Sequence, residues 1–157
     1  MSKATRGTQM LEKAGIAFTV HCYAYDADAG RVGLQAAKAL AQPPARVLKT
    51  LMALVEGKPV CVIVPSDREV SMKKLAAAFG GKSAQMMNSA DAERISGYKV
   101  GGISPFGQTR KPRTAMEQDS LLHEFVFING GQRGLQVKLD PRDALRLLDG
   151  VAAPLVS

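Results

Sequence analysis

The sequence predicts a single α/β domain in which helices surround a curved, barrel-like mixed β-sheet. Segments of period two, typical of strands, alternate with Ala-rich and Leu-rich segments that are typical of helices. Their order is irregular and lacks the strict strand–helix repeat of a doubly wound parallel sheet, so a mixed sheet is favoured. The 157 residues suit one domain over residues 1–157, long enough to bury a substantial core without disulfides or a metal.

The first half of the chain is predicted to form a helix, a strand, a second helix and a hairpin. The first helix covers about residues 8–14, with Thr8 as its N-cap and Gly15 at its end. The segment FTVHCYAY alternates as a strand, and GLQAAKALAQPP is a short helix closed by two prolines. The segment RVLKTLMALVEGKPVCVIV is typical of two buried strands joined by a turn.

The second half is predicted to begin with two helices, SMKKLAAAFGG and SADAERISG. Ser71 and Ser89 are their expected N-caps, and Gly80 and Gly97 are expected to end them. The strands RTAME, HEFVFING and LQVKL follow, with turn-rich segments between them.

The last predicted element is the helix DPRDALRLLDG. Asp140 can cap this helix, Pro141 suits its first turn, and Gly150 can end it. No linker, repeat or low-complexity segment interrupts the order of elements, which agrees with one domain.

The charge of the chain favours a polyanionic partner. Lys and Arg number 21 against 14 Asp and Glu, which gives a formal net charge of +7 and a pI near 9.7. Nucleic acid is the first candidate, although many soluble proteins are basic without such a partner. Cys22 and Cys61 lie in apolar strand segments and fit a reducing compartment. With neither a signal peptide nor a membrane span in MSKATRGTQMLEKAGIAF, we expect a cytoplasmic protein without membrane contact.

Lys49 is a single charge within an apolar strand face. Strand side chains alternate between faces, so Lys49 shares its face with Val47, Leu51, Ala53 and Val55. One interpretation places Lys49 near a strand end, where its stem covers apolar surface and its ammonium reaches water. The other places it in a cleft where a fixed cation meets an anionic or carbonyl ligand, because an unpaired buried charge is costly.

Neither a metal site nor a protein nucleophile is indicated. His21 and Cys22 are neighbours on a strand and face opposite ways, and His123 stands alone. The segment GISPFG spaces Ser104 as G-x-S-x-x-G, one residue longer than the nucleophile elbow, with Pro105 directly after the serine. We therefore expect neither a bound metal nor a serine hydrolase.

Two glycine-rich segments are better candidates for a binding site. YKVGGISPFG and INGGQRG each place a glycine pair at the end of a strand-like segment. Glycines there permit positive φ and let a ligand approach backbone N–H groups, which can bind a carbonyl or phosphate, although two ordinary turns remain the alternative. No G-x-G-x-x-G or Walker signature accompanies them, so we expect no cofactor.

Three segments together resemble a known family. RVLKTLMA, YKVGGISPFGQ and FINGGQRGLQV, in this order and at these separations, look like the YbaK family of cysteinyl-tRNA(Pro) deacylases, relatives of the editing insertion of bacterial prolyl-tRNA synthetases. The resemblance covers nearly the whole chain, from LEKAGIAFTVHCY to the last helix. It implies trans-editing, in which the ester joining cysteine to tRNA(Pro) is hydrolysed at the acceptor end, in partnership with prolyl-tRNA synthetase.

The resemblance also assigns roles to residues. The family's essential lysine matches Lys49, which would hold the aminoacyl end of the tRNA and stabilise the negative charge that develops on the ester oxygen. In this family the substrate's own thiol is thought to attack the ester and leave as a thiolactone, so no protein nucleophile is needed. The residues that the resemblance assigns to substrate binding are Tyr23, Val32, Thr50, Gly101, Gly102, Ser104, Pro105, Asn129, Gly130, Gly131 and Arg133.

Four positions depart from the family pattern. Val32 stands where close relatives have Phe, and Asn129 where they have Ser; both changes would reshape the aminoacyl pocket. Cys22 replaces a usual Thr, and Gln136 a small or acidic polar residue. Three functions therefore stay open: deacylation of Cys-tRNA(Pro), deacylation of another small misacylated residue such as alanine, and a non-catalytic module that binds tRNA or the synthetase.

Overall fold

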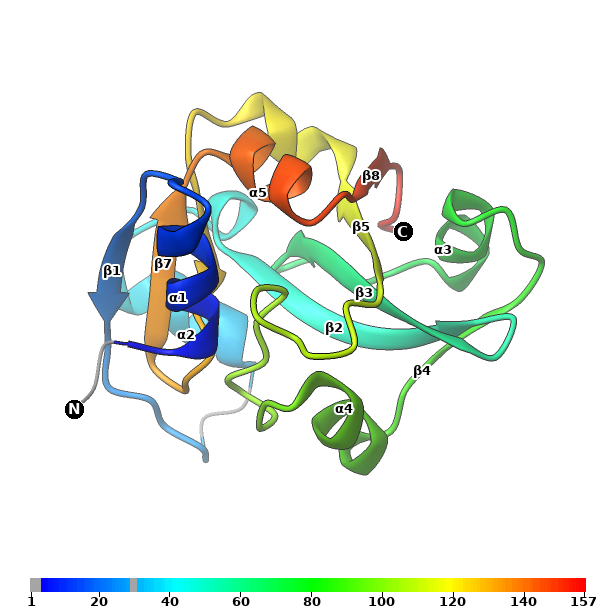
Figure 1. Cartoon of the computed structure of the whole chain (residues 1–157), viewed down its shortest axis with the longest axis horizontal. Coiled ribbons are helices and arrows are strands. Elements are labelled where there is room, and N and C mark those ends of the chain that lie inside the picture. Colours follow the sequence, from blue (N-terminus) through cyan, green and yellow to red (C-terminus); the bar gives the residue numbers. More distant parts are fainter. Residues whose placement is uncertain (1–3, 29–30) are drawn as a thin grey trace.

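The computed structural model describes residues 4–28 and 31–157. In this part of the chain, eight strands form two sheets, with five α-helices and two 3₁₀ helices around them (Figure 1). The helices are α1 (Arg6–Lys13), α2 (Val32–Ala39), η1 (Pro44–Arg46), α3 (Met72–Ala78), α4 (Ser89–Ser96), η2 (Gln118–Leu122) and α5 (Pro141–Leu147). The strands are β1 (Thr19–Cys22), β2 (Leu48–Val55), β3 (Lys58–Pro65), β4 (Ala84–Met86), β5 (Arg113–Glu117), β6 (Val126–Asn129), β7 (Leu135–Leu139) and β8 (Val151–Ala153).

The smaller sheet is antiparallel and has the strand order β1-β7-β6. Alternation along its strands gives it two apolar faces. One face packs on α1 and α5 and also meets the larger sheet, so that Leu11, Val137 and Ile128 are fully buried in a shared core. The other face packs on α2, where the small side chains of Ala36 and Ala37 contact Phe127.

The larger sheet is mixed and has the strand order β4-β2-β3-β5-β8. Strand β2 is antiparallel to both of its neighbours, whereas β5 is parallel to β3 and to β8. Helix α3 covers one face of this sheet through Leu75, and α4 covers the other through Ala92 and Ile95 (Figure 1). The central strand β3 is buried along six consecutive residues, which explains its continuous apolar run.

Among the described residues, the strands of the two sheets are joined by one backbone bridge, at the margin of β2. An isolated parallel bridge joins Val47, just before β2, to Phe127 of β6. On the same edge of β2, β4 pairs only with residues 53–55. The predicted α/β class with a mixed sheet and surrounding helices is confirmed, but 'barrel-like' describes it only loosely, because the described strands form two sheets and no closed barrel. Because the strands do not close, the edge of β2 over residues 48–52 is left beside a gap between the sheets.

Two helix starts differ from the prediction. Thr5, not Thr8, is the N-cap of α1: its hydroxyl accepts a hydrogen bond from Thr8 N (3.0 Å), and the Thr8 hydroxyl accepts one from Thr5 N (2.8 Å). Asn88, not Ser89, caps α4. In both cases two polar residues within one turn are able to cap, so residue type alone does not choose between them.

Other helix ends follow the prediction closely. Ser71 and Asp140 cap α3 and α5, and Gly97 ends α4 in a left-handed conformation with φ of 80°. After α5 the left-handed residue is Asp149, with φ of 49°, rather than Gly150. Asp can adopt this conformation with little strain, which moves the stop one residue earlier. None of the described helices is long and apolar enough to cross a membrane.

Candidate active site

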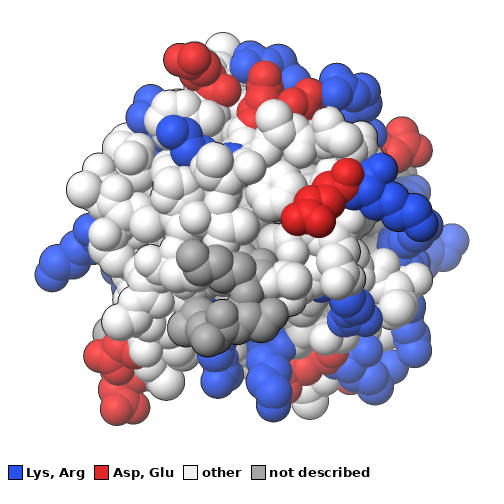
Figure 2. Space-filling model, turned by 60° about the vertical axis from the view of Figure 1, so that its left-hand side comes forward, with Lys and Arg blue, Asp and Glu red and all other residues white. Residues whose placement is uncertain are grey.

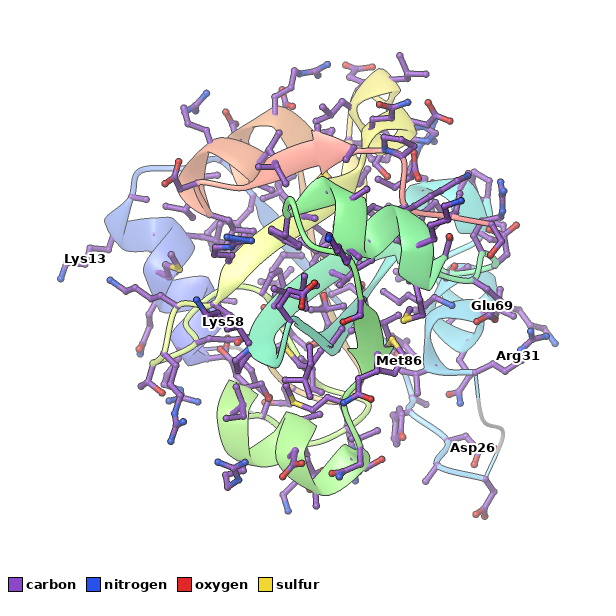
Figure 3. The ribbon with its side chains drawn as sticks, turned by 90° about the vertical axis from the view of Figure 1, so that its right-hand side faces the viewer. Lys13, Asp26, Arg31, Lys58, Glu69 and Met86 are labelled. Atoms are coloured by element: carbon purple, nitrogen blue, oxygen red, sulfur yellow. The ribbon has the colours of Figure 1, made fainter. Side chains whose placement is uncertain are left out.

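A cleft of about 410 Å³ lies along the open edge of β2. Its walls come from β2, the start of α2, the segment around β4 and α4, the loop at residues 100–103, and the ends of β6 and β7. Figure 3 shows three of its residues, Arg31, Glu69 and Met86, on the same side of the molecule, away from Lys13 and Lys58. The lining residues predicted from the sequence are Val32, Lys49, Thr50, Gly101 and Asn129.

The register of β2 turns the backbone of Thr50 toward the cleft. Ser66 N donates a hydrogen bond to Val47 O (3.0 Å), so Val47 directs its backbone C=O toward β3. In an antiparallel pair every second residue bonds to the partner strand. Residues 49 and 51 therefore direct their backbone groups toward β3 as well. Thr50 and Met52 therefore direct their backbone N–H and C=O groups away from β3. Met87 N donates to Met52 O (3.1 Å), which uses one of these outward groups. The outward groups of Thr50 face the cleft.

Lys49 lies in the wall of the cleft and is half-buried. Among the described residues, none of the three ion pairs involves it, although Glu69 lines the same cleft. Gly33, at the start of α2, packs close by: a Cβ on this residue would lie 3.6 Å from Lys49 Cβ and only 2.6 Å from Ser66 Cβ. The cleft interpretation of Lys49 agrees with this geometry.

The two glycine loops pack against each other backbone to backbone. A Cβ on Gly102 would lie 2.8 Å from Arg133 N, so only glycine permits this approach. Asn129 ties the loops together: its Nδ2 donates to Gly101 O (3.3 Å) and Gln132 O (3.2 Å). Its Oδ1 accepts from Gly131 N (2.6 Å) and from the N–H of Gln132 (3.2 Å). Asn129 is thus both a cleft residue and the clamp of the loops.

Several predicted site residues lie behind the cleft wall and not in it. Ser104 and Pro105 are buried, and Ser104 Oγ accepts a hydrogen bond from Phe106 N (3.1 Å). Gly130 and Gly131 pack against core side chains. A Cβ on Gly130 would meet the Leu135 side chain, and a Cβ on Gly131 would meet the Tyr98 ring.

Arg133 lies next to the cleft but points across its loop. Its Nε donates to Val100 O (2.9 Å), and its guanidinium lies 5.3 Å from the centroid of the Tyr25 ring. Arg133 is exposed, and a Cβ on Gly101, which lines the cleft, would lie 3.3 Å from its Nε. The Arg133 side chain therefore braces the Gly101 loop at the mouth of the cleft.

Gln136 is a cleft residue that the sequence marked only as a departure from the family. It is 3% exposed, and its Oε1, like the Oγ1 of Thr50, is buried without a hydrogen-bond partner among the described residues. Tyr23 lies behind it, under α2, where burial raises the pKa of its hydroxyl and the Gln136 side chain partly offsets that rise. A buried acceptor without a donor is unfavourable, so both atoms suit a ligand that brings a donor.

The remaining cleft wall is largely apolar. Its apolar side chains include Met52, Met86, Met87, Ala92 and Ile103. These residues come from β2, β4, α4 and neighbouring loops, and no local pattern in the sequence marks them as neighbours. The cleft thus combines an apolar wall with one ammonium and a few polar groups, a composition typical of small-ligand sites.

Metal and thiol chemistry find no support in this part of the chain. Among the described residues, no three or more His, Cys, Asp or Glu side chains are grouped so that they could hold a metal ion. Burial raises the pKa of the Cys61 thiol to about 12, which keeps it protonated and unreactive. Cys22 is exposed on β1.

Residues 32–147 match the family model of the aminoacyl-tRNA editing domain. The chain therefore belongs to this family, as the resemblance to YbaK proteins predicted, and with it to the class of aminoacyl-tRNA deacylases.

Three curated relatives show how far the similarity extends. EbsC of Enterococcus faecalis, provisionally a Cys-tRNA(Pro)/Cys-tRNA(Cys) deacylase, is 28% identical over 98% of this chain and 93% of its own length. The multifunctional Ser/Thr-tRNA deacylase ProXp-y of Escherichia coli is 28% identical over 63% of this chain and 62% of its own. The proline–tRNA ligase of Caldicellulosiruptor saccharolyticus is 39% identical over 40% of this chain, which is 11% of the ligase.

A solved structure supports the fold. The crystal structure of a candidate trans-editing enzyme for prolyl-tRNA synthetase superposes with a TM-score of 0.84, covering 100% of this chain and 98% of that one, at 20% identity. At this level of identity the likeness concerns the fold alone.

Proposed function

We propose that this protein hydrolyses Cys-tRNA(Pro) in trans, with the aminoacyl ester bound in the cleft beside Lys49. The observation that carries the proposal is the position of Lys49: it lines the same cleft as Gly101, it makes no ion pair with the described residues, and the chain belongs to the editing family. A fixed cation there is suited to a phosphate or carbonyl oxygen of the aminoacyl end. Its charge would stabilise the oxyanion that forms when the ester is attacked.

In the proposed reaction the nucleophile is the thiol of the substrate. Its sulfur bonds to the ester carbonyl carbon, the bond from that carbon to the ribose oxygen breaks, and the ribose oxygen takes up the proton that the thiol gives up. The thiolactone that leaves then opens with water to cysteine. The protein's part is to position the thiol and stabilise the oxyanion, which agrees with the inert Cys61 and the structural Ser104.

The polar atoms of the cleft suit the amino acid of the substrate. Thr50 Oγ1 and Gln136 Oε1 lack partners, and the backbone C=O of Thr50 faces the same space. These groups would accept hydrogen bonds from the α-ammonium or the side-chain donor of a small amino acid. The apolar wall, which includes Ile103 and Met87, makes the binding of a charged substrate side chain unfavourable.

Another amino acid is the main alternative. The acceptors Thr50 Oγ1 and Gln136 Oε1 would also receive a hydroxyl donor, and the relative ProXp-y is a Ser/Thr-tRNA deacylase. Alanine, the alternative considered from the sequence, has no side-chain donor and would leave one of these acceptors without a hydrogen bond. The similarity to proline–tRNA ligases supports tRNA(Pro) and prolyl-tRNA synthetase as partners in either case.

A panel of labelled tRNAs tests the proposal. Deacylation would be measured under single-turnover conditions with cysteinyl-, seryl- and alanyl-tRNA(Pro) and with cysteinyl-tRNA(Cys), together with a search for thiolactone. We expect cysteinyl-tRNA(Pro) to be cleaved fastest, because serine is a much weaker nucleophile and alanine has none. Comparable rates on alanyl-tRNA(Pro) would show that water, and not the substrate thiol, attacks the ester. If no tRNA were cleaved, the protein would be a binding module without this activity.

A further inference from the structure

Phe125, just before β6, carries two cations on its ring. The guanidinium carbon of Arg46 lies 4.5 Å from the ring centroid, and Lys138 Nζ lies 4.1 Å from it. Phe125 in turn meets Phe127 edge to face, with ring centroids 5.9 Å apart. We call Arg46, Phe125 and Lys138 the Phe125 cluster. All three residues are half-buried, so the ring holds both cations in place near the surface.

The cluster lacks a counter-charge. In the part of the chain that the structure describes, neither Arg46 nor Lys138 takes part in an ion pair. Arg46 Nε is buried without a hydrogen-bond partner there, and Nη1 makes one long bond to Gln42 Oε1 (3.4 Å). Burial and the charge of Lys138 lower the pKa of the nearby His21, a sign that the positive potential is not neutralised. Two cations that share one aromatic ring and make no ion pair with the described residues are suited to an anion.

The cluster and the cleft lie on two continuous pieces of chain. Arg46, the last residue of η1, precedes Lys49 by three residues, and Phe125 precedes Asn129 by four. At about 3.3 Å per residue, these separations place the cluster about 10 to 13 Å from the cleft wall. The bridge between Val47 and Phe127 fixes the two segments side by side.

We propose that the Phe125 cluster binds a phosphate of the tRNA outside the cleft, with Arg46 and Lys138 as its donors and Phe125 as the residue that positions them. The proposal rests on the tRNA substrate of the proposed function. A nucleic acid whose terminal ester lies in the cleft presents further phosphates within this distance, and phosphate contacts supply affinity without reading sequence. Figure 2 shows Lys and Arg side chains around the edge of one face of the molecule, many of them on its right and lower sides.

A charge-matched pair of double variants tests the proposal. Arg46→Gln with Lys138→Gln removes the two cations of the cluster, and Lys13→Gln with Lys58→Gln removes two that Figure 3 shows away from Arg31 and Glu69. Lys58 lies at the turn of the β2–β3 hairpin, about 25 Å along β2 from Val47 at 3.3 Å per residue. Both variants change the net charge by the same amount, so global electrostatics cancel in the comparison.

The readout is the affinity for uncharged tRNA(Pro) across a salt titration. We expect the cluster variant to lose about tenfold in affinity at low salt and the magnitude of its slope of log K against log salt to fall by about 0.7 to 0.9, the contribution of one phosphate contact. The control variant should stay within about threefold with an unchanged slope. Wild-type affinity in the cluster variant, or an equal loss in both variants, would overturn the proposal.

Two further measurements separate this site from the catalytic one. Cleavage of a small substrate, cysteine esterified to adenosine, should be unchanged in the cluster variant, because that substrate does not reach Arg46 or Lys138; a parallel loss would mean that the cleft itself is disturbed and would contradict the proposal. Phe125→Leu keeps apolar packing and should give an intermediate loss of tRNA affinity. If the wild type binds tRNA yet cleaves no ester, the proposed function fails and the phosphate site still stands.

Discussion

In the cleft, Thr50 Oγ1 and Gln136 Oε1 are buried and have no hydrogen-bond partner among the described residues, whereas in the glycine loops behind it Ser104 and Asn129 are bonded to backbone atoms. The motif residues of one family thus fall into two groups. One group faces the space where a ligand fits, and the other holds the wall in shape. An unpaired buried group in a native protein needs an explanation, and a bound ligand is one, so we propose that the first group touches substrate.

The largest expected effect is that of Lys49→Ala. If Lys49 stabilises the oxyanion, kcat/KM on Cys-tRNA(Pro) should fall on the order of 10²-fold or more. The thermal unfolding temperature should change little, because the side chain is half-buried and in none of the ion pairs of the described residues. Lys58→Ala is the matched control, and near-normal turnover in a folded Lys49→Ala protein would remove Lys49 from the mechanism.

Asn129→Ala should lower both the stability of the protein and its activity, because Asn129 lines the cleft and also holds the glycine loops together. It removes the clamp that joins Gly101 O, Gly131 N and the backbone of Gln132. We expect a loss of about 1 to 3 kcal/mol in the free energy of unfolding, since buried backbone groups lose their partners. Activity should fall about tenfold because the loop that lines the cleft is no longer held. Denaturant unfolding and kinetics measure the two effects, and an effect on neither would show that the loops hold without the clamp.

Thr50→Val and Ser104→Ala should give opposite results. Thr50→Val removes an unpaired hydroxyl, so stability should hold within about 0.5 kcal/mol while kcat/KM falls about fivefold. Ser104→Ala removes a bonded hydroxyl, so stability should fall by about 1 kcal/mol while kcat/KM stays within about twofold. If Thr50→Val lowered stability but not kcat/KM, and Ser104→Ala lowered kcat/KM but not stability, the division into ligand-facing and wall-holding residues would be wrong.

Val32→Phe should have the smallest effect. Val32 lines the cleft at the first turn of α2, and a larger side chain there narrows the aminoacyl space without touching Lys49. We expect KM for Cys-tRNA(Pro) to change about threefold, kcat to stay nearly constant, and no activity to appear on alanyl-tRNA(Pro). Steady-state kinetics on both substrates check this, and a gain on alanine would mean that the shape of the cleft alone selects the amino acid.

The sequence predicted much of the fold because local signals are strong in this chain. The caps at Ser71 and Asp140, the buried hairpin and the mixed order of elements all follow from residue type and period. The three-residue strands β4 and β8 were missed, because so short a segment carries no measurable period. The separation into two sheets depends on how far β4 and the segment of β6 pair along the edge of β2. That extent is set by tertiary packing, so local sequence patterns do not predict it.

The site was predicted in part. Lys49 stood out because one charge on an apolar face is unusual, and Thr50, Gly101 and Asn129 came with the family motifs. Those motifs do not separate residues that face the ligand from residues that hold the loops, so Ser104 was placed in the pocket although it is buried behind it. The Met side chains of the apolar wall carry no pattern that marks them as neighbours.

The most direct test is to bind cysteine joined to adenosine by an amide, which cannot be hydrolysed by the substrate thiol at a useful rate. Backbone amide chemical shifts of the protein would be followed during the titration. The account predicts the largest changes at Thr50 and Gly101, which line the cleft, and small changes at Ser104, which lies behind it. Large changes confined to residues away from the cleft, or saturation unaffected by Lys49→Ala, would contradict the claim that the open edge of β2 is where the aminoacyl end binds.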